Sequence, residues 1–240
     1  MSFKDLARIF KRLIKYSMGL DFFTRRDIKY GTERFGTPYG GWNIITDFIH
    51  NNSIIYSFGV GEDASFDISL IERFNVTVDA FDPTPESIRW VYNQNFPSQF
   101  RFHEYGIASI DGNILLHPPK NPKYTSYTIL DQPKTNTDGF SVPVKRLSTI
   151  MKENGHENID ILKMDIEGAE YQVIMDIEQS KIRPDQILIE FHHRFSGVGI
   201  KKSKIAIQRI RNMGYDLYFI SKTGEEYCFI RTNIAKHLII

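Results

Sequence analysis

The chain has 240 residues, of which 41% are hydrophobic and 25% charged, and its formal net charge at pH 7 is +1. These values are typical of one globular domain with a short extension, and the near-zero charge gives the whole molecule no bias towards nucleic acid. The single cysteine, Cys228, excludes an intrachain disulfide and fits a reducing compartment. No apolar run approaches the roughly 18 to 20 residues that span a bilayer, and the basic N-terminus does not read as a signal peptide, so we expect a cytoplasmic protein.

Residues 2–18 have the pattern of a basic amphipathic helix. Apolar residues recur at helical spacing, and five basic residues stand against one acid. We expect this helix to pack on the domain or to cover the active site. The alternative is a weak contact with a membrane surface or a partner protein.

A segment rich in glycine and aromatic residues, Tyr30–Trp42, comes next. It could form a lid over a site or a loop held by its aromatic side chains. Residues Trp42–Asn51 are expected to form a short helix before the first strand. We therefore divide the chain into an N-terminal extension, residues 1–50, and a main domain, residues 51–240.

The main domain opens with a strand followed by a glycine-rich turn. The apolar run Ile54–Tyr56 leads into Gly59-Val60-Gly61, and such a turn lets a nucleotide-like ligand approach the main chain. The next strand, Val76–Phe81, is followed by Asp82, about 20 residues downstream of the turn, where a ribose-binding carboxylate is expected. Together these features predict a cofactor that contains adenosine.

The rest of the chain alternates strands with helices, which predicts an α/β fold with a mostly parallel sheet and helices on both faces. The expected helices are Ala64–Phe74, Pro85–Asn93, Ser148–Asn154, Glu170–Gln179 and Ser203–Met213. The expected strands are Phe100–Glu104, Asn113–His117, Ser141–Val144, Ile159–Met164 and Gln186–Phe191. Tyr215–Ser221 and Tyr227–Arg231 should close the sheet as an antiparallel hairpin. Between Pro118 and Gly139 we expect a long surface loop.

Carboxylates gather where one of these strands ends. Asp165, Glu167 and Glu170 follow Met164 closely, and His192 follows the next strand along the chain. Ligands bind at the carboxyl ends of strands in open α/β sheets, so these side chains are candidates for chemistry. An unpaired lysine inside an apolar strand is costly, and we expect Lys163 to pair with Asp165.

The segment Leu162–Glu170, read as LKMDIEGAE, resembles the LKIDIEGAE block of the FkbM-type S-adenosylmethionine-dependent methyltransferases. The similarity extends over roughly residues 50 to 195 and implies the class I methyltransferase fold, with S-adenosylmethionine as cofactor. The family pattern places Tyr56–Gly61 at the cofactor loop, Phe81–Pro83 at the ribose, Glu104–Ala108 near the adenine and Ile189–His192 at the end of the fifth strand. The implied cofactor-binding residues are Ser57, Phe58, Gly59, Gly61, Asp82, Pro83, Gly106, Ile107 and Asp165.

The resemblance implies methyl transfer, most simply to the oxygen of a sugar, a polysaccharide or another small hydroxylated metabolite. A hydroxyl acceptor needs a base within about 2.6 to 3.2 Å of its proton, and Asp165, Glu167 and His192 are the predicted catalytic residues. Asp165 and His192, with Glu190 as a third ligand, could instead hold a divalent metal ion if further oxygen ligands complete the shell.

Two other functions stay open at this point. Class I methyltransferases often carry an acid where Ser57 stands, so a protein that binds the cofactor without catalysis, or serves as a scaffold, is one alternative. An NAD-dependent oxidoreductase would share the glycine turn and Asp82, but the third glycine of that motif is absent from the chain.

Overall fold

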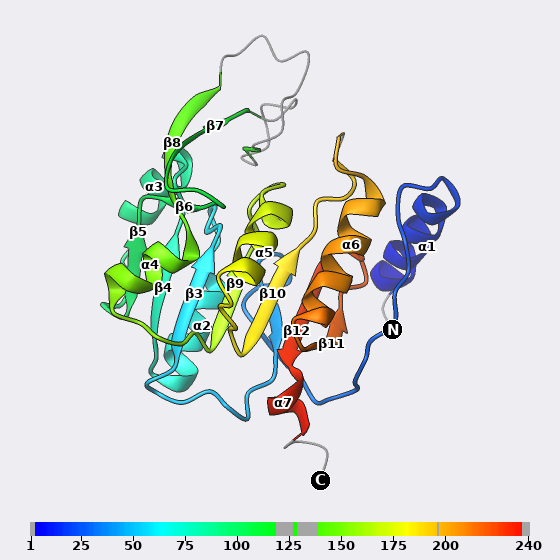
Figure 1. Ribbon diagram of the computed structural model, residues 1–240, viewed down its shortest axis with the longest axis horizontal. Coiled ribbons are helices and arrows are strands. Elements are labelled where there is room, and N and C mark those ends of the chain that lie inside the picture. The colour runs from blue at the N-terminus through cyan, green and yellow to red at the C-terminus, as the bar shows by residue number, and fades with distance from the viewer. Residues whose placement is uncertain (1–2, 119–126, 129–138, 196, 237–240) are drawn as a thin grey trace.

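The computed structural model describes residues 3–118, 127–128, 139–195 and 197–236. Seven strands form its central sheet, in the order β11-β12-β10-β9-β3-β4-β5 (Figure 1). Every neighbouring pair is parallel except the two that contain β12, which runs antiparallel to both β10 and β11. The strands are β3 (Ile54–Phe58), β4 (Thr77–Phe81), β5 (Phe100–His103), β9 (Ile161–Met164), β10 (Gln186–Glu190), β11 (Tyr215–Ile220) and β12 (Glu226–Arg231). The prediction of a mostly parallel sheet that ends in an antiparallel hairpin is confirmed.

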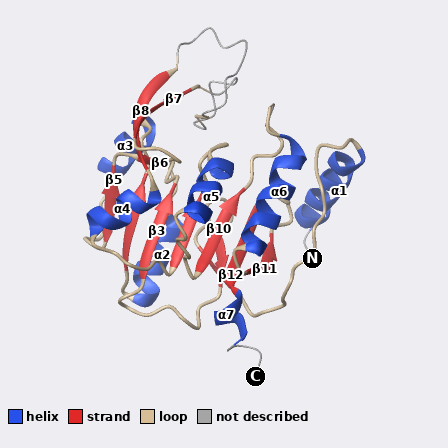
Figure 2. Cartoon of the chain, in the orientation of Figure 1, coloured by secondary structure: helices blue, strands red, loops and turns tan. Residues whose placement is uncertain are grey.

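Helices cover both faces of this sheet (Figure 2). Successive strand residues point to opposite faces, and β3 shows the result: Tyr56 packs into a core with α4, α5 and α6, whereas Ile55 packs into a second core with α2 and α3. Because both faces of the central strands are buried, these strands are mostly apolar, and the polar residues within them, Ser57, Asp79 and Lys163, are buried as well. The helices are α2 (Ser65–Phe74), α3 (Pro85–Tyr92), α4 (Leu147–Asn154), α5 (Glu170–Gln179), α6 (Gly199–Asn212) and α7 (Thr232–Ala235).

The helix predicted over Trp42–Asn51 is wrong. This segment opens with β2 (Trp42–Ile44), which pairs with β1 (Glu33–Phe35) in a small antiparallel sheet. The buried side chain of Gln186 accepts the Ile45 N–H at 3.0 Å and donates to the Ile45 carbonyl at 2.8 Å. The backbone groups that a helix would pair internally are thus satisfied by a side chain of the main sheet.

The apolar residues of the same segment belong to the core of the sheet. Ile44, Ile45 and Ile49 are buried together with residues of α2, β3 and β4. The division of the chain at residue 50 stays a prediction, although residues 42–49 share the core of the main domain.

A second sheet has the order β6-β8-β7, built from β6 (Gly106–Ile107), β7 (Gly112–Leu116) and β8 (Phe140–Lys145). Strands β7 and β8 are antiparallel and their ends lead into the predicted loop Pro118–Gly139, most of which lies outside the described residues. Within it, His117 and Thr128 form a bridge through two backbone hydrogen bonds. This bridge brings Tyr127 and Thr128 back towards the carboxyl edge of the main sheet.

The predicted N-terminal helix is α1 (Phe3–Ser17), which lies near α6 in the view of Figure 1. The chain then runs along β11, where the Asp27 amide donates to the Leu217 carbonyl at 2.8 Å. Of the helices in the described ranges, none combines the length and the apolar character that crossing a bilayer requires.

Candidate active site

The loop after β3 is shaped by two glycines. Gly59 and Gly61 have φ of 85° and 56°, a region that glycine enters without steric cost. A Cβ on Gly59 would lie 1.9 Å from the carbonyl oxygen of Asp165, so glycine is what lets this loop pack against the loop after β9. The two loops therefore meet at the carboxyl edge of the sheet.

The predicted ribose carboxylate, Asp82, braces this loop. Its Oδ2 accepts the amides of Val60 and Gly61 at 3.0 and 2.9 Å, and its Oδ1 accepts the amide and the hydroxyl of Thr84 at 2.9 and 2.7 Å. Four donors hold the carboxylate in place at the end of β4, facing the glycine turn. A role in binding ribose hydroxyls stays a prediction.

Ser57 and Lys163 are placed differently from what the sequence predicted. Ser57 is fully buried near Asp67 and does not line the cavity described below. Lys163 donates from Nζ to the Gly59 carbonyl at 2.5 Å, and burial raises the pKa of Asp67 while the nearby Lys163 charge opposes that rise. The predicted pair between Lys163 and Asp165 is wrong: Nζ of Lys163 is taken by the Gly59 carbonyl, and Asp165, just past the end of β9, has its carboxylate near His192.

The loop between β9 and α5 brings three carboxylates to His192. Nδ1 of His192 lies 2.6 Å from Oε1 of Glu170, and Nε2 lies 3.3 Å from Oε2 of Glu167 and 3.7 Å from Oδ1 of Asp165. Glu170 is fully buried and also accepts the Gly168 amide at 3.0 Å. The three predicted catalytic residues thus lie together between the ends of β9 and β10.

The turn that carries Glu167 has unusual backbone angles. Glu167 has φ of 49° and Gly168 has φ of 106°, and a residue other than glycine reaches positive φ only at a cost that the surroundings must offset. Two contacts support this backbone: the Thr128 hydroxyl donates to the Glu167 carbonyl at 2.5 Å, and the Glu170 carboxylate accepts the Gly168 amide. Strained turns of this kind concentrate at functional sites.

Protons balance much of the negative charge of this cluster. Burial alone would lower the pKa of His192, but the charge of Glu170 and the hydrogen bond to it outweigh burial and raise that pKa well above 6.5. Burial raises the pKa of Glu190 to about 9, and the negative charge of Asp165 adds to the rise. The neighbouring carboxylates therefore favour the protonated form of His192, and burial favours the protonated form of Glu190.

A cavity of about 1040 Å³ joins the two loops. The glycine loop, Asp82 and Pro83 line one part of it, together with Gly106 and Ile107. The cluster around His192 lines another part. With the exception of Ser57, all of the predicted cofactor-binding and catalytic residues contribute to the wall.

Several lining residues carry no local sequence signal. Arg34 comes from β1, and the turn between β11 and β12 adds Ser221, Thr223 and Glu225. The hairpin residues reach the cavity because β12 lies beside β10 in the assembled sheet, and Arg34 reaches it from the separate β1-β2 sheet. Tyr39 is the exception, since the glycine-rich aromatic segment was a candidate lid; its side chain is 90% exposed at the cavity.

The same edge offers oxygen and nitrogen donors that could hold a cation. Single ligand atoms of Asp165, Glu190 and His192 lie within 4.8 Å of one another. This is the alternative use of the cluster that the sequence left open, and it requires Glu190 to lose its proton and His192 to bind through Nε2.

A parallel sheet with one antiparallel strand inserted between β10 and β11, and a cavity at its carboxyl edge, define a class I methyltransferase fold. The model of the methyltransferase FkbM domain matches residues 55–217. The chain belongs to the FkbM methyltransferase family, as the Leu162–Glu170 block indicated.

Two curated relatives, both named probable methyltransferase-like protein 24, come from Homo sapiens and Rattus norvegicus. Each is 27% identical over 158 residues, which is 65% of this chain but only 37% of the relative. Among solved structures, the chain is similar to the methyltransferase FkbM from Methylobacillus flagellatus KT, with 15% identity and a TM-score of 0.47, covering 75% of this chain and 44% of that one.

Proposed function

We propose that this protein is an S-adenosylmethionine-dependent methyltransferase that methylates an oxygen of a hydroxylated acceptor. Family membership supports methyl transfer. The observation that carries the proposal is that one cavity joins the glycine loop and Asp82 to the cluster around His192. A nucleoside bound at the glycine loop and a base at His192 would therefore face the same cavity.

The residues at the glycine loop fit the cofactor. Gly61 has open space where a Cβ would stand, which leaves room for an adenosine, and the absence of a Cβ on Gly106 lets β6 pack closely against the Pro83 ring. Asp82 and Pro83 would hold the ribose, Gly106 and Ile107 the adenine, and Asp165 the end nearest the acceptor. When bound, the cofactor supplies an electrophilic methyl group on sulfur, while the chain orients the acceptor and removes its proton.

His192 is the proposed base. Glu170 holds Nδ1, so the ring presents Nε2 to the cavity and its orientation is determined by a buried partner. In the neutral form of the ring, with the proton on Nδ1 held by Glu170, Nε2 would accept the proton of an acceptor hydroxyl. A base in this position typically contributes about 10²- to 10⁴-fold in rate. Asp165 and Glu167, on the same side of the ring, would stabilise the imidazolium that results.

The chemistry of the outer wall supports a hydroxyl-rich acceptor, either a glycan or a small metabolite. Arg34, Ser221 and Thr223 place polar groups at the part of the cavity near His192, and Tyr39 adds an exposed ring against which a sugar can pack. The acceptor class rests on this lining and on the family resemblance.

Ligand binding separates this proposal from its alternatives. S-adenosylmethionine and S-adenosylhomocysteine should raise the unfolding temperature of the purified chain, because a ligand that binds only the folded state stabilises it, and NAD should not. Stabilisation by NAD alone would support an oxidoreductase and overturn the proposal. Binding of S-adenosylmethionine without methyl transfer to any hydroxylated acceptor in a broad panel would support a non-catalytic binding protein.

A further inference from the structure

Helix α1 is attached to the domain by its polar side. Arg12 is buried, at 8% exposure, whereas Leu6, Phe10 and Leu13 are 50%, 65% and 48% exposed. Residues three and four apart share one face of a helix, so these three apolar side chains form a face that points away from the domain. A helix that packs on a globular domain for stability usually does the reverse and buries its apolar stripe.

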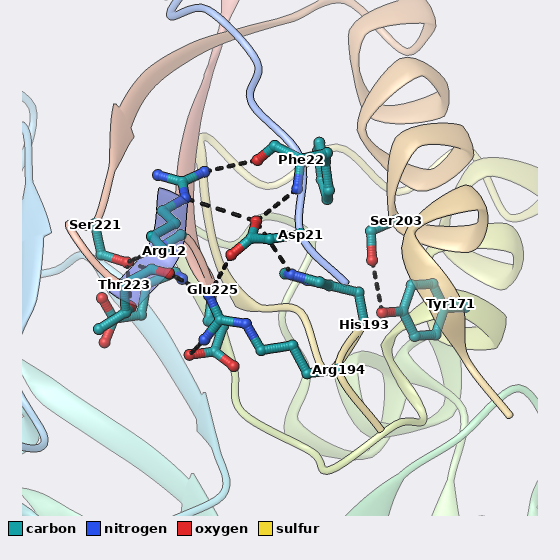
Figure 3. Close-up of polar contacts among 12 residues, drawn as sticks. Arg12, Asp21, Phe22, Tyr171, His193, Arg194, Ser203, Ser221, Thr223 and Glu225 are labelled. Atoms are coloured by element: carbon teal, nitrogen blue, oxygen red, sulfur yellow. Dashed lines mark hydrogen bonds and ion pairs between the residues drawn. The ribbon is translucent and has the colours of Figure 1, made fainter. Parts of the chain in front are cut away.

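A buried polar cluster holds α1 in this orientation (Figure 3). Arg12 donates to the Phe22 carbonyl at 2.9 Å, and its Nε lies 3.6 Å from Oδ1 of Asp21. Asp21 in turn pairs with Arg194, and Nε2 of His193 lies 3.6 Å from Oδ1 of Asp21. The attachment therefore depends on charge and hydrogen bonds, and the apolar face is left open.

Further apolar side chains are exposed on the helix and just after it. Ile14 lies on α1, and Met18 and Leu20 follow its end. Together with Leu6, Phe10 and Leu13 they form what we name the α1 apolar face. Contiguous exposed apolar surface in a folded protein marks a site of interaction with another protein or a membrane.

Basic side chains are exposed on α1 and on the segment that follows it. Lys11 is exposed on α1, and Arg25, Arg26 and Lys29 are exposed on the segment that follows. The described acids of the same stretch are engaged: Asp21 within the buried cluster and Asp27 with Arg211. An apolar face flanked by basic side chains is complementary to a bilayer with anionic headgroups, where the apolar residues enter the interface and the cations attract the lipid charge.

We propose that the α1 apolar face binds the surface of an anionic lipid bilayer, with α1 lying in the plane of the interface. The buried polar cluster that holds α1 also contacts the cavity wall. Arg194 of this cluster pairs with Glu225 and donates to the Thr223 carbonyl, and both Thr223 and Glu225 line the cavity. A chain bound in this way holds one wall of its cavity next to the bilayer.

Co-sedimentation of the full chain with vesicles tests the proposal. Vesicles of equal parts phosphatidylcholine and phosphatidylserine should bind the protein, and binding should weaken with added salt and on vesicles of phosphatidylcholine alone. The double substitution Phe10→Glu with Leu13→Glu should lower the affinity at least about tenfold, because it removes apolar insertion and adds repulsion. Both side chains are exposed and leave the Arg12 contacts in place, so thermal unfolding should be unchanged.

The matched control is Ile110→Glu with Leu115→Glu, which alters two exposed apolar residues elsewhere by the same charge. This variant should bind vesicles like the parent. Failure of the parent to bind anionic vesicles, or equal loss in both variants, would overturn the proposal. A parent dimer that the Phe10 and Leu13 substitutions dissociate, without vesicle binding, would instead identify the face as a contact between two copies of the chain.

Discussion

Glu170 holds His192 by a contact of 2.6 Å between Oε1 and Nδ1, and the same oxygen accepts the Gly168 amide. One buried carboxylate thus sets both the orientation of the ring and the shape of the strained turn that carries Glu167. Glu170 at the start of α5 and His192 after β10 therefore form one structural unit, although 22 residues separate them.

Replacing Glu170 by glutamine should lower kcat by about 100-fold or more with a smaller change in the KM for the acceptor. The amide keeps an acceptor for Gly168 but removes the charge that stabilises the His192 imidazolium, and such charge-assisted contacts are the strong ones. Steady-state kinetics with the acceptor measure the effect. Glu72→Gln, on the exposed side of α2, serves as the control and should leave both constants unchanged.

His192→Ala should reduce turnover by about 10²- to 10⁴-fold while the affinity for S-adenosylmethionine, measured by calorimetry, stays close to that of the parent. Asp165→Ala should damage both, because that carboxylate lies between the two parts of the cavity. His50→Ala, which removes an exposed histidine outside the cavity wall, is the control and should leave turnover and affinity unchanged. Full turnover in both variants would move the search for the base to other residues of the wall.

The pH dependence of kcat/KM follows from the raised pKa of His192. A base must be neutral to accept a proton, so the rate should rise as the pH increases through a value above 6.5, the ordinary pKa of the group, and should level off beyond it. In Glu170→Gln the midpoint should move towards lower pH, because the charge that raises the pKa most is gone. A midpoint that does not move would contradict the role assigned to Glu170.

Asp82→Ala should weaken S-adenosylmethionine binding by about 10- to 150-fold, since losing a charged hydrogen-bond partner costs roughly 1.5 to 3 kcal/mol. The structure adds a second expectation: the glycine loop loses the acceptor of its Val60 and Gly61 amides, so the apo protein should also unfold at a lower temperature. Asp216→Ala, outside the cavity wall, provides the comparison. Unchanged affinity in a folded variant would remove Asp82 from the cofactor site.

Glu190→Gln tests whether the cluster uses a metal ion. With a pKa of about 9, Glu190 is protonated at neutral pH, and glutamine resembles that form in shape and charge. We therefore expect turnover within about threefold of the parent and no loss of activity with EDTA. A large loss in this variant, together with inhibition by EDTA that Mg²⁺ or Mn²⁺ reverses, would show that Asp165, Glu190 and His192 hold a cation.

Asp21 should make the folded protein sensitive to acid. Burial opposes its ionisation, but the contacts with His193, Arg194 and the Phe22 amide outweigh burial and lower its pKa from 3.8 to about 2. A carboxylate with a lowered pKa stabilises the folded state above pH 3.8 and loses that contribution as the pH falls towards 2. Denaturant unfolding of Asp21→Asn should show lower stability at neutral pH and a smaller decline over this interval than the parent.

Local sequence patterns predicted the helices that have a regular apolar spacing and a clear starting residue. The boundaries of α3 and α5 were expected to within one residue, because Pro85 and Glu170 begin apolar helical patterns of ordinary length. The rule that ligands bind at the carboxyl ends of parallel strands also predicts that Asp82, Asp165 and His192 lie on one edge of the sheet.

What the sequence missed depends on contacts between distant residues. Ile45 is extended because Gln186, 141 positions away, takes both of its backbone groups, and the local pattern around Trp42 carries no trace of that partner. The partner of Lys163 was likewise mistaken, since a two-residue spacing indicates one face only while the strand continues. Thr223 lines the cavity because β12 is inserted beside β10, and Arg34 lines it because the small β1-β2 sheet packs near the same edge; neither position has a local sequence pattern.

The attachment of α1 also has a consequence for the order of events during synthesis. Asp21 is synthesised well before its partner Arg194, which is 173 residues further along the chain. At about 5 to 20 residues per second, the helix waits roughly 10 to 35 s for the residues that dock it. Throughout that interval both its basic and its apolar sides are accessible, so a newly made chain meets any available surface with α1 before the fold is complete.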